Sequence, residues 1–479
     1  MKSIIKFTAA CFIFTSFLSQ NIQTQETPPV DNFPEESPLI LDLPTAINLA
    51  ITSNRNFANS LDNIQRAQLS IDLSLSAFDL RLIPSGDVGF IGGGKAGLGG
   101  TVGGSLEICK KFTFGTQISL RPYASVDAKH YHTGLQAKIV QPLLKGFGKE
   151  YTLAPVFAAQ FAYRTAFRGS YASGVEMIFR LINAMYNIVR LETILKLDTE
   201  ALQRLTHFYS AIKVKERIGM ADSLDVYRTE IELKASEDSI NSSQESLQDA
   251  KDRLRELLTL PLNRDIVIDL STEYVPLDPI VEESISSALA NRVEIEQAED
   301  RWNETRRLSK LAKSNLLPDL DLVLDFTNFG YDEVFTESFT TERDSRWGIG
   351  FMTSTDWNRT AQQIAYQQSI FTVVNAERSY NQTQDSVILD VKRAIRALHR
   401  ASQKIVLQLT QIHSSEGGLK LAKLKFNRGL ANNFDVIQAE KTLRNAQSAY
   451  QSAIIDHKIG EYRFLSAVGL LVDKPKICL

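Results

Sequence analysis

The chain has 479 residues, with 53 Lys or Arg and 56 Asp or Glu, so its formal net charge at pH 7 is −3. Hydrophobic residues make up 43% of the sequence, and the mean hydropathy is −0.14. This hydropathy is too low for a protein with many transmembrane helices, and the apolar fraction is too high for a disordered chain. The near-neutral charge gives no electrostatic drive toward nucleic acid.

The start of the chain predicts an export signal peptide over residues 1–25. Lys2 and Lys6 form a basic start, and residues 7–18 form an apolar stretch. This stretch is too short to span a bilayer, which favours a signal peptide over an anchor. A polar, proline-rich linker is expected over residues 26–41.

The rest of the chain is predicted to be a long internal duplication. Residues 217–233 match residues 427–443 at an offset of 210 residues. A period of this length indicates duplicated half-domains instead of a short-repeat solenoid. The predicted parts after the linker are a first repeat over 42–260, a connector over 261–277, a second repeat over 278–471 and a tail over 472–479.

The first repeat is expected to begin with a helix that has Asp42 as its N-cap and Pro44 in its first turn. This helix is predicted to run for about 40 residues to Pro84. A β segment is expected over residues 84–142. A helix of about 70 residues then ends at Gly219, and a return helix closes the repeat.

Glycine fills much of this β segment between residues 86 and 104, where the first repeat carries 27 residues more than the second. The insertion adds either a hairpin or a longer loop, and the sequence does not decide between them. Residues 89–95 match the form GxxxxGK, but Ala96 replaces the Mg²⁺-binding hydroxyl and no helix can follow, so nucleotide binding is not expected. His130 and His132 lack further ligands nearby and predict no metal site.

The second repeat has the same layout. A helix is expected from Asp278, with Pro279 in its first turn, to Pro318. A β segment over residues 319–356 follows, then a helix of about 70 residues that ends at Gly429, and a return helix.

The chain has two cysteines after the predicted signal peptide, Cys109 and Cys478. The sequence leaves open whether they form a disulfide.

Both long helices carry a coiled-coil pattern. In the first repeat, apolar residues recur every seven positions, at Leu181, Ile188, Leu195, Leu202 and Tyr209. A 70-residue helix spans about 105 Å, a length that no compact domain needs. On the helices alone, a solvated coiled-coil stalk is one alternative.

The β segments favour a membrane-facing sheet. Leu320, Leu322, Leu324 and Phe326 alternate with residues that are mostly Asp. A strand with one apolar and one charged face fits a small antiparallel sheet or a lipid-facing barrel. Because a few strands cannot close a barrel alone, closure would need several protomers.

These features together resemble the TolC-type outer-membrane factor (outer membrane efflux protein) family. The resemblance runs from about Asp42 to Leu471. The segments that carry it are the glycine turns followed by Asp225-Val226 and Asp435-Val436, the sequence QPLLKGFG at 141–148, LLP at 316–318 and LDL at 41–43.

The resemblance implies a mainly α fold with a small β part. It implies duplicated halves, a long α-helical barrel and a shared transmembrane β-barrel, with four strands per protomer and twelve in a homotrimer. The implied location is the cell outer membrane, extending into the periplasm. The implied partners are a periplasmic adaptor (membrane fusion) protein, an inner-membrane transporter and outer-membrane lipid, with no nucleic acid.

The implied function is the exit duct of a tripartite efflux pump or a type I secretion system, a passive conduit gated at its periplasmic tip. No catalytic residue, metal site or cofactor is expected, because the sequence has no nucleophile, metal-ligand or phosphate-binding pattern. The alternative is a periplasmic coiled-coil protein that tethers envelope layers without a pore.

By the same resemblance, Asp435 and Asp225 are candidates for a pore constriction. Gln438 and Arg228 occupy the positions where a second acidic ring would require Asp. Each Asp also falls in an early turn of its helix, where a carboxylate favours helix formation, and the two roles can coexist. The residues expected at the periplasmic tips that contact the adaptor are Gly219, Met220, Ala221, Gly429, Leu430 and Ala431.

Overall fold

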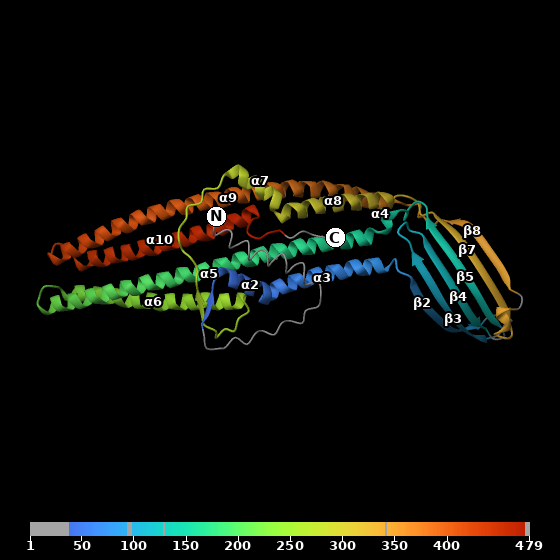
Figure 1. Cartoon of the computed structure of the whole chain (residues 1–479), viewed down its shortest axis with the longest axis horizontal. Helices are drawn as coiled ribbons and strands as arrows, with labels where there is room; N and C mark the ends of the chain where they lie inside the picture. Colours follow the sequence, from blue (N-terminus) through green and yellow to red (C-terminus); the bar gives the residue numbers. More distant parts are fainter. Residues whose placement is uncertain (1–37, 93–97, 128–129, 341–342, 475–479) are drawn as a thin grey trace. The chain divides into compact units, whose positions relative to one another are not determined.

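The computed structural model describes residues 38–92, 98–127, 130–340 and 343–474 (Figure 1). The predicted signal peptide, most of the linker and Cys478 lie outside the described residues. The chain divides into two compact units. One unit contains residues up to 62, 167–295 and those from 383 on, and the other contains 63–166 and 296–382.

The fold is mainly helical with a small β part, which confirms the predicted fold class. No described helix is both long enough and apolar enough to cross a membrane. The helices of four or more residues are α2 (Leu43–Ser53), α3 (Arg55–Ser76), α4 (Lys149–Thr152), α5 (Ala154–Arg217), α6 (Ser223–Leu257), α7 (Val281–Asn291), α8 (Val293–Ser314), α9 (Thr360–Asn427) and α10 (Asn433–Val468).

The first helix of each repeat is shorter than predicted. Asp42 caps α2 as expected, and its Oδ1 accepts a hydrogen bond from the Thr45 amide at 3.0 Å. The helix then breaks at Asn54, whose Oδ1 accepts from the Phe57 amide at 3.0 Å and whose Nδ2 donates to the Leu257 carbonyl at 2.9 Å. This side chain caps α3 and ties it to a distant segment, so the single 40-residue helix was a wrong prediction.

The second repeat differs from its prediction at the same place. Helix α7 begins at Val281 with Ile280 at the N-cap, so the predicted cap at Asp278 is wrong. A second break, at Arg292, separates α7 from α8. In the first repeat, Pro84 lies within a strand instead of marking the end of a helix.

The unit that contains the helix hairpins has one large hydrophobic cluster and smaller separate ones along the helices. Leu181 and Ile188, two members of the seven-residue pattern, are fully buried. They pack in one cluster with Leu254 of α6 and with the two-stranded sheet, in which β1 (Leu39–Leu41) pairs in parallel with β6 (Ile266–Ile268). The long helices α5 and α9 have 64 and 68 residues.

The other unit contains a six-stranded antiparallel sheet (Figure 1). Its order is β2-β3-β4-β5-β7-β8, so the strands follow chain order, and helices α4 to α8 and β6 lie between β5 and β7 along the chain. The strands are β2 (Arg81–Gly92), β3 (Leu98–Lys111), β4 (Gln117–Val126), β5 (Tyr131–Pro142), β7 (Asp321–Asp332) and β8 (Asp344–Met352).

The protomer therefore contributes six strands to the sheet, and the expected four is corrected. The first repeat supplies four strands and the second supplies two. The glycine-rich stretch accounts for the difference, because Gly86 pairs with Gly104 and Gly89 with Thr101 inside the β2–β3 pair. The insertion is thus an added hairpin, which settles the alternative that the sequence left open.

Candidate functional site

The candidate site consists of two helical tips, where α5 turns into α6 and α9 turns into α10. Both helices end at a left-handed glycine, with φ of 73° at Gly219 and 71° at Gly429. The Met220 amide donates to the Lys215 carbonyl at 2.8 Å, and the Leu430 amide donates in the same way to the Lys425 carbonyl at 2.9 Å. This is the Schellman pattern, and glycine supplies the conformation that it requires.

The tips present apolar side chains to solvent. Met220 is 72% exposed and Leu430 is 73% exposed, whereas Ala221 and Ala431 are half-buried. Exposed apolar groups at the end of a helical hairpin are candidates for contact with another protein. The large apolar side chains exposed in and next to the two turns are Ile218, Met220, Leu224, Leu430 and Phe434.

The two aspartates behave differently. Asp435 is exposed, and its Oδ2 accepts a hydrogen bond from the Asn432 amide at 3.2 Å, which completes a capping box at the start of α10. Asp225 is half-buried in the first turn of α6, where the N-cap side chain is that of Asp222. A carboxylate in the first turn is favourable in both helices.

A buried asparagine that was not predicted joins the starts of α6 and α10. Asn433 is fully buried, and its Nδ2 donates to the Asp225 carbonyl at 2.7 Å and to Thr229 Oγ1 at 3.1 Å. Ser223 is the residue at the matching position of the first repeat, and it is exposed. The different residues at this matching position were the only sequence signal that could have singled out Asn433.

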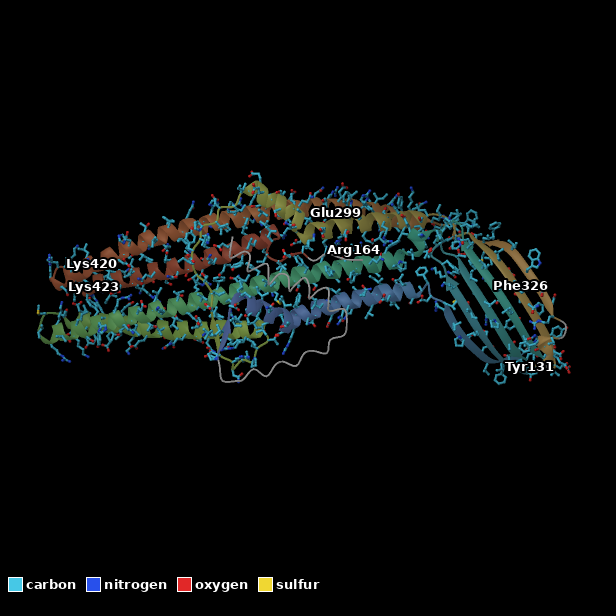
Figure 2. All side chains as sticks on the ribbon, viewed as in Figure 1. Tyr131, Arg164, Glu299, Phe326, Lys420 and Lys423 are labelled. Carbon is cyan, nitrogen blue, oxygen red and sulfur yellow. The ribbon has the colours of Figure 1, made fainter. Side chains whose placement is uncertain are left out.

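Ion pairs connect the helices further from the turns. Arg204 Nε and Lys423 Nζ both donate to the Glu440 carboxylate, at 3.0 and 2.6 Å. Figure 2 shows Lys423 toward the tip end of α9. Deeper along the helices, Arg444 Nε donates to Asp198 Oδ1 at 2.7 Å, and this hydrogen bond raises the pKa of the Arg444 guanidinium.

The six-stranded sheet has one apolar and one polar face. On β7, Leu324 and Phe326 are register partners of Ile349 and Trp347 on β8, while Asp325 between them points to the opposite face. Phe326 is labelled on the sheet in Figure 2. This arrangement follows the alternation that the sequence shows in the second repeat.

The described residues form no cluster of three or more His, Cys, Asp or Glu side chains that could hold a metal ion. His132 Nε2 lies 3.1 Å and His130 Nδ1 3.9 Å from the Asp127 carboxylate, so the prediction that these histidines have no further ligand nearby is wrong. The GxxxxGK sequence begins inside β2, its end lies outside the described residues, and the described chain resumes at Leu98 in β3.

The fold is that of outer membrane channels of known structure. VceC from Vibrio cholerae superimposes with a TM-score of 0.70 at 16% identity, over 89% of this chain and 96% of that chain. CmeC from Campylobacter jejuni gives 0.69 at 14% identity, over 91% and 87%. The outer-membrane channel OprN gives 0.68 at 16% identity, over 89% of each chain. No curated protein matches the sequence.

Residues 284–454 match the model of the outer membrane efflux protein family. These residues therefore carry an outer membrane efflux protein domain, which confirms the resemblance and the predicted outer membrane localisation. The family and the structural neighbours are channels, not enzymes, and they support an efflux duct.

Proposed function

We propose that three copies of this chain form a passive duct that is the outer membrane exit of a tripartite efflux pump or a type I secretion system. The observation that carries the proposal is the sheet with one apolar and one polar face. Such a sheet can face lipid on one side and water on the other. Helices of 64 and 68 residues, each about 100 Å long, supply the length of a periplasmic conduit.

The tips are the proposed contact with a periplasmic adaptor protein, which in turn connects to an inner-membrane transporter. The contact residues are those of the two glycine turns. Exposed Met220 and Leu430 provide an apolar surface that a partner would bury. The proposed tip residues remain Gly219, Met220, Ala221, Gly429, Leu430 and Ala431.

The same tips are proposed to gate the duct. In a trimer, three exposed Asp435 carboxylates around one axis would repel each other and attract cations. Asp225 lies at the matching position of the other hairpin and is the second candidate for the constriction. Energy for transport would come from the inner-membrane transporter, since the duct itself would perform no chemistry.

The test is conductance of the purified protein in planar bilayers, with block by a trivalent cation such as hexamminecobalt. A trivalent cation about 6 Å from one carboxylate in water gains roughly 2 kcal/mol, so loss of three carboxylates should weaken block at least about tenfold. Asp435→Asn removes the charge but keeps an oxygen that can accept the capping hydrogen bond, whereas Asp435→Ala removes both.

Weaker block in both variants supports the gate. Unchanged block in Asp435→Asn would leave Asp435 only its capping role and would remove it from the constriction. The absence of any discrete conductance in the wild-type protein and in both variants would refute the duct itself.

A further inference from the structure

We infer that the six-stranded sheet closes with two further copies into an eighteen-stranded transmembrane barrel, through antiparallel pairing of β8 with β2 of the neighbouring copy. This inference rests on the proposed trimer. It concerns the added hairpin of β2 and β3.

The first argument is that the added hairpin continues both faces of the sheet without a break. One row of register partners crosses all six strands and is entirely apolar: Leu82, Ile108, Leu120, Ala137, Phe326 and Trp347. The adjacent row lies on the opposite face and is mostly polar: Arg81, Cys109, Ser119, Lys138, Asp325 and Gly348. A hairpin outside the membrane would have no reason to keep this register.

The second argument is the composition and exposure of the hairpin's apolar face. Val88 and Phe90 on β2 are 79% and 78% exposed, and Val102 on β3 is 51% exposed. Their face carries no charged residue from 82 to 90 or from 100 to 108. The opposite face of the same two strands carries Asp87 and Glu107. An exposed apolar surface of this kind fits lipid and would be costly in water.

The third argument is length. A membrane-spanning β-strand needs about 9–11 residues. The six strands have 12, 14, 10, 12, 12 and 9 residues in sheet order. The added strands β2 and β3 are therefore long enough to cross the hydrocarbon layer.

The fourth argument concerns the two edges. Within the protomer, β2 pairs only with β3 and β8 pairs only with β7 in the described residues (Figure 1). Open edges do not occur in the hydrocarbon layer, because unpaired backbone N–H and C=O groups have no water there to bond with. Six strands are too few to close alone, since about eight strands leave just enough room for side chains. A copy of the same chain must therefore cover each edge.

Strand direction makes that pairing geometrically simple. Six consecutive antiparallel strands place β2 and β8 in opposite directions, so β8 of one copy and β2 of the next are antiparallel. Three copies give eighteen strands, within the range of known outer membrane barrels. Since the diameter grows roughly linearly with strand number, this barrel would be about 1.5-fold wider than a twelve-stranded one.

The test is cross-linking between protomers in the full-length trimer, with Cys109 and Cys478 replaced by Ser. Ser85→Cys on β2 is combined in turn with Asp344→Cys, Arg346→Cys, Gly348→Cys or Gly350→Cys on β8, which all lie on the same polar face. The matched control places the first cysteine at Ser119 on β4, also on that face. Oxidation of at least one Ser85 combination should give covalent dimers and trimers on denaturing gels, and no Ser119 combination should.

The opposite pattern, in which Ser119→Cys links to β8 and Ser85→Cys does not, would exclude the hairpin from a twelve-stranded barrel and overturn the inference. A conducting trimer in which no Ser85 combination links would also overturn it, while leaving the duct standing. Failure to isolate a trimer or to observe conductance with the wild-type protein would instead refute the proposed function.

A second measurement does not depend on the register between copies. Val102→Trp and Thr101→Trp are made in a background whose native tryptophans are replaced by Phe, and lipids brominated in their acyl chains are the quencher. Val102 and Thr101 are adjacent on β3 and point to opposite faces. Strong quenching of Val102→Trp alone supports a lipid-facing hairpin, whereas equal and weak quenching of both variants overturns it.

Discussion

Replacement of the buried Asn433 should loosen the two helical tips together. Its Nδ2 donates two hydrogen bonds in the described structure, to the Asp225 carbonyl and to Thr229 Oγ1. In Asn433→Ala both bonds are lost. The Asp225 carbonyl still accepts from Thr229 Oγ1 at 2.8 Å, so no buried group loses its last partner.

The expected cost follows from this geometry. Each neutral hydrogen bond contributes about 1 kcal/mol net, so two give about 2 kcal/mol. Since 1.4 kcal/mol is a factor of ten, local opening should become about 25-fold more frequent. The amides in the first turns of α6 and α10 should therefore exchange their hydrogens about 25-fold faster.

Hydrogen exchange followed by mass spectrometry is the assay, on peptides that cover residues 220–230 and 430–440. Ser223→Ala is the matched control, because Ser223 holds the same place in the first repeat but is exposed. If Asn433→Ala exchanges within about twofold of Ser223→Ala in both peptides, Asn433 does not couple the tips.

Two further predictions concern stability, measured by chemical denaturation of the purified protein. Gly429→Ala places a β-carbon at φ 71° and should lower the free energy of unfolding by about 1 kcal/mol. Gly417→Ala within α9, where a β-carbon meets no atom within 4 Å, should raise it by about 0.5 kcal/mol. Destabilisation of equal size in both variants would contradict the turn argument. Asp198→Asn removes the charge of the 2% exposed partner of Arg444 and should lower the free energy of unfolding by about 2 kcal/mol. Asp390→Asn, in the largely exposed pair with Arg393, should lower it by under about 0.5 kcal/mol. Equal losses in the two variants would refute a role for burial.

The sequence predicted best where a pattern was long. Glycine turns at 219 and 429, the Asp42 cap and the long helices between the sheet and the tips all have local signals that tertiary packing does not override. The alternation of apolar and polar residues likewise identified the sheet and its two faces. Repetition of the glycine turns and of the long helices in both halves of the chain made these predictions stronger than any one motif.

The sequence failed where a single side chain determined the outcome. The break at Asn54 depends on a hydrogen bond to a carbonyl 203 residues away, which no local pattern contains. Asp278 followed by proline has the form of a helix start, yet the helix begins at Val281. The glycine-rich strands were ambiguous because glycine is depleted in strands and common in turns and loops, and only the register with β4 places them in the sheet.

The added hairpin also constrains how such a sheet can grow by mutation. A gain of one strand would reverse the chain direction at its end, so the helix that follows would start on the wrong side of the membrane. A gain of two strands restores the direction. Here four strands of the sheet, β2 to β5, precede α5, whereas two, β7 and β8, precede α9. Divergence between the halves of this duplicated chain is therefore expected in whole hairpins, with strand parity preserved while barrel circumference changes.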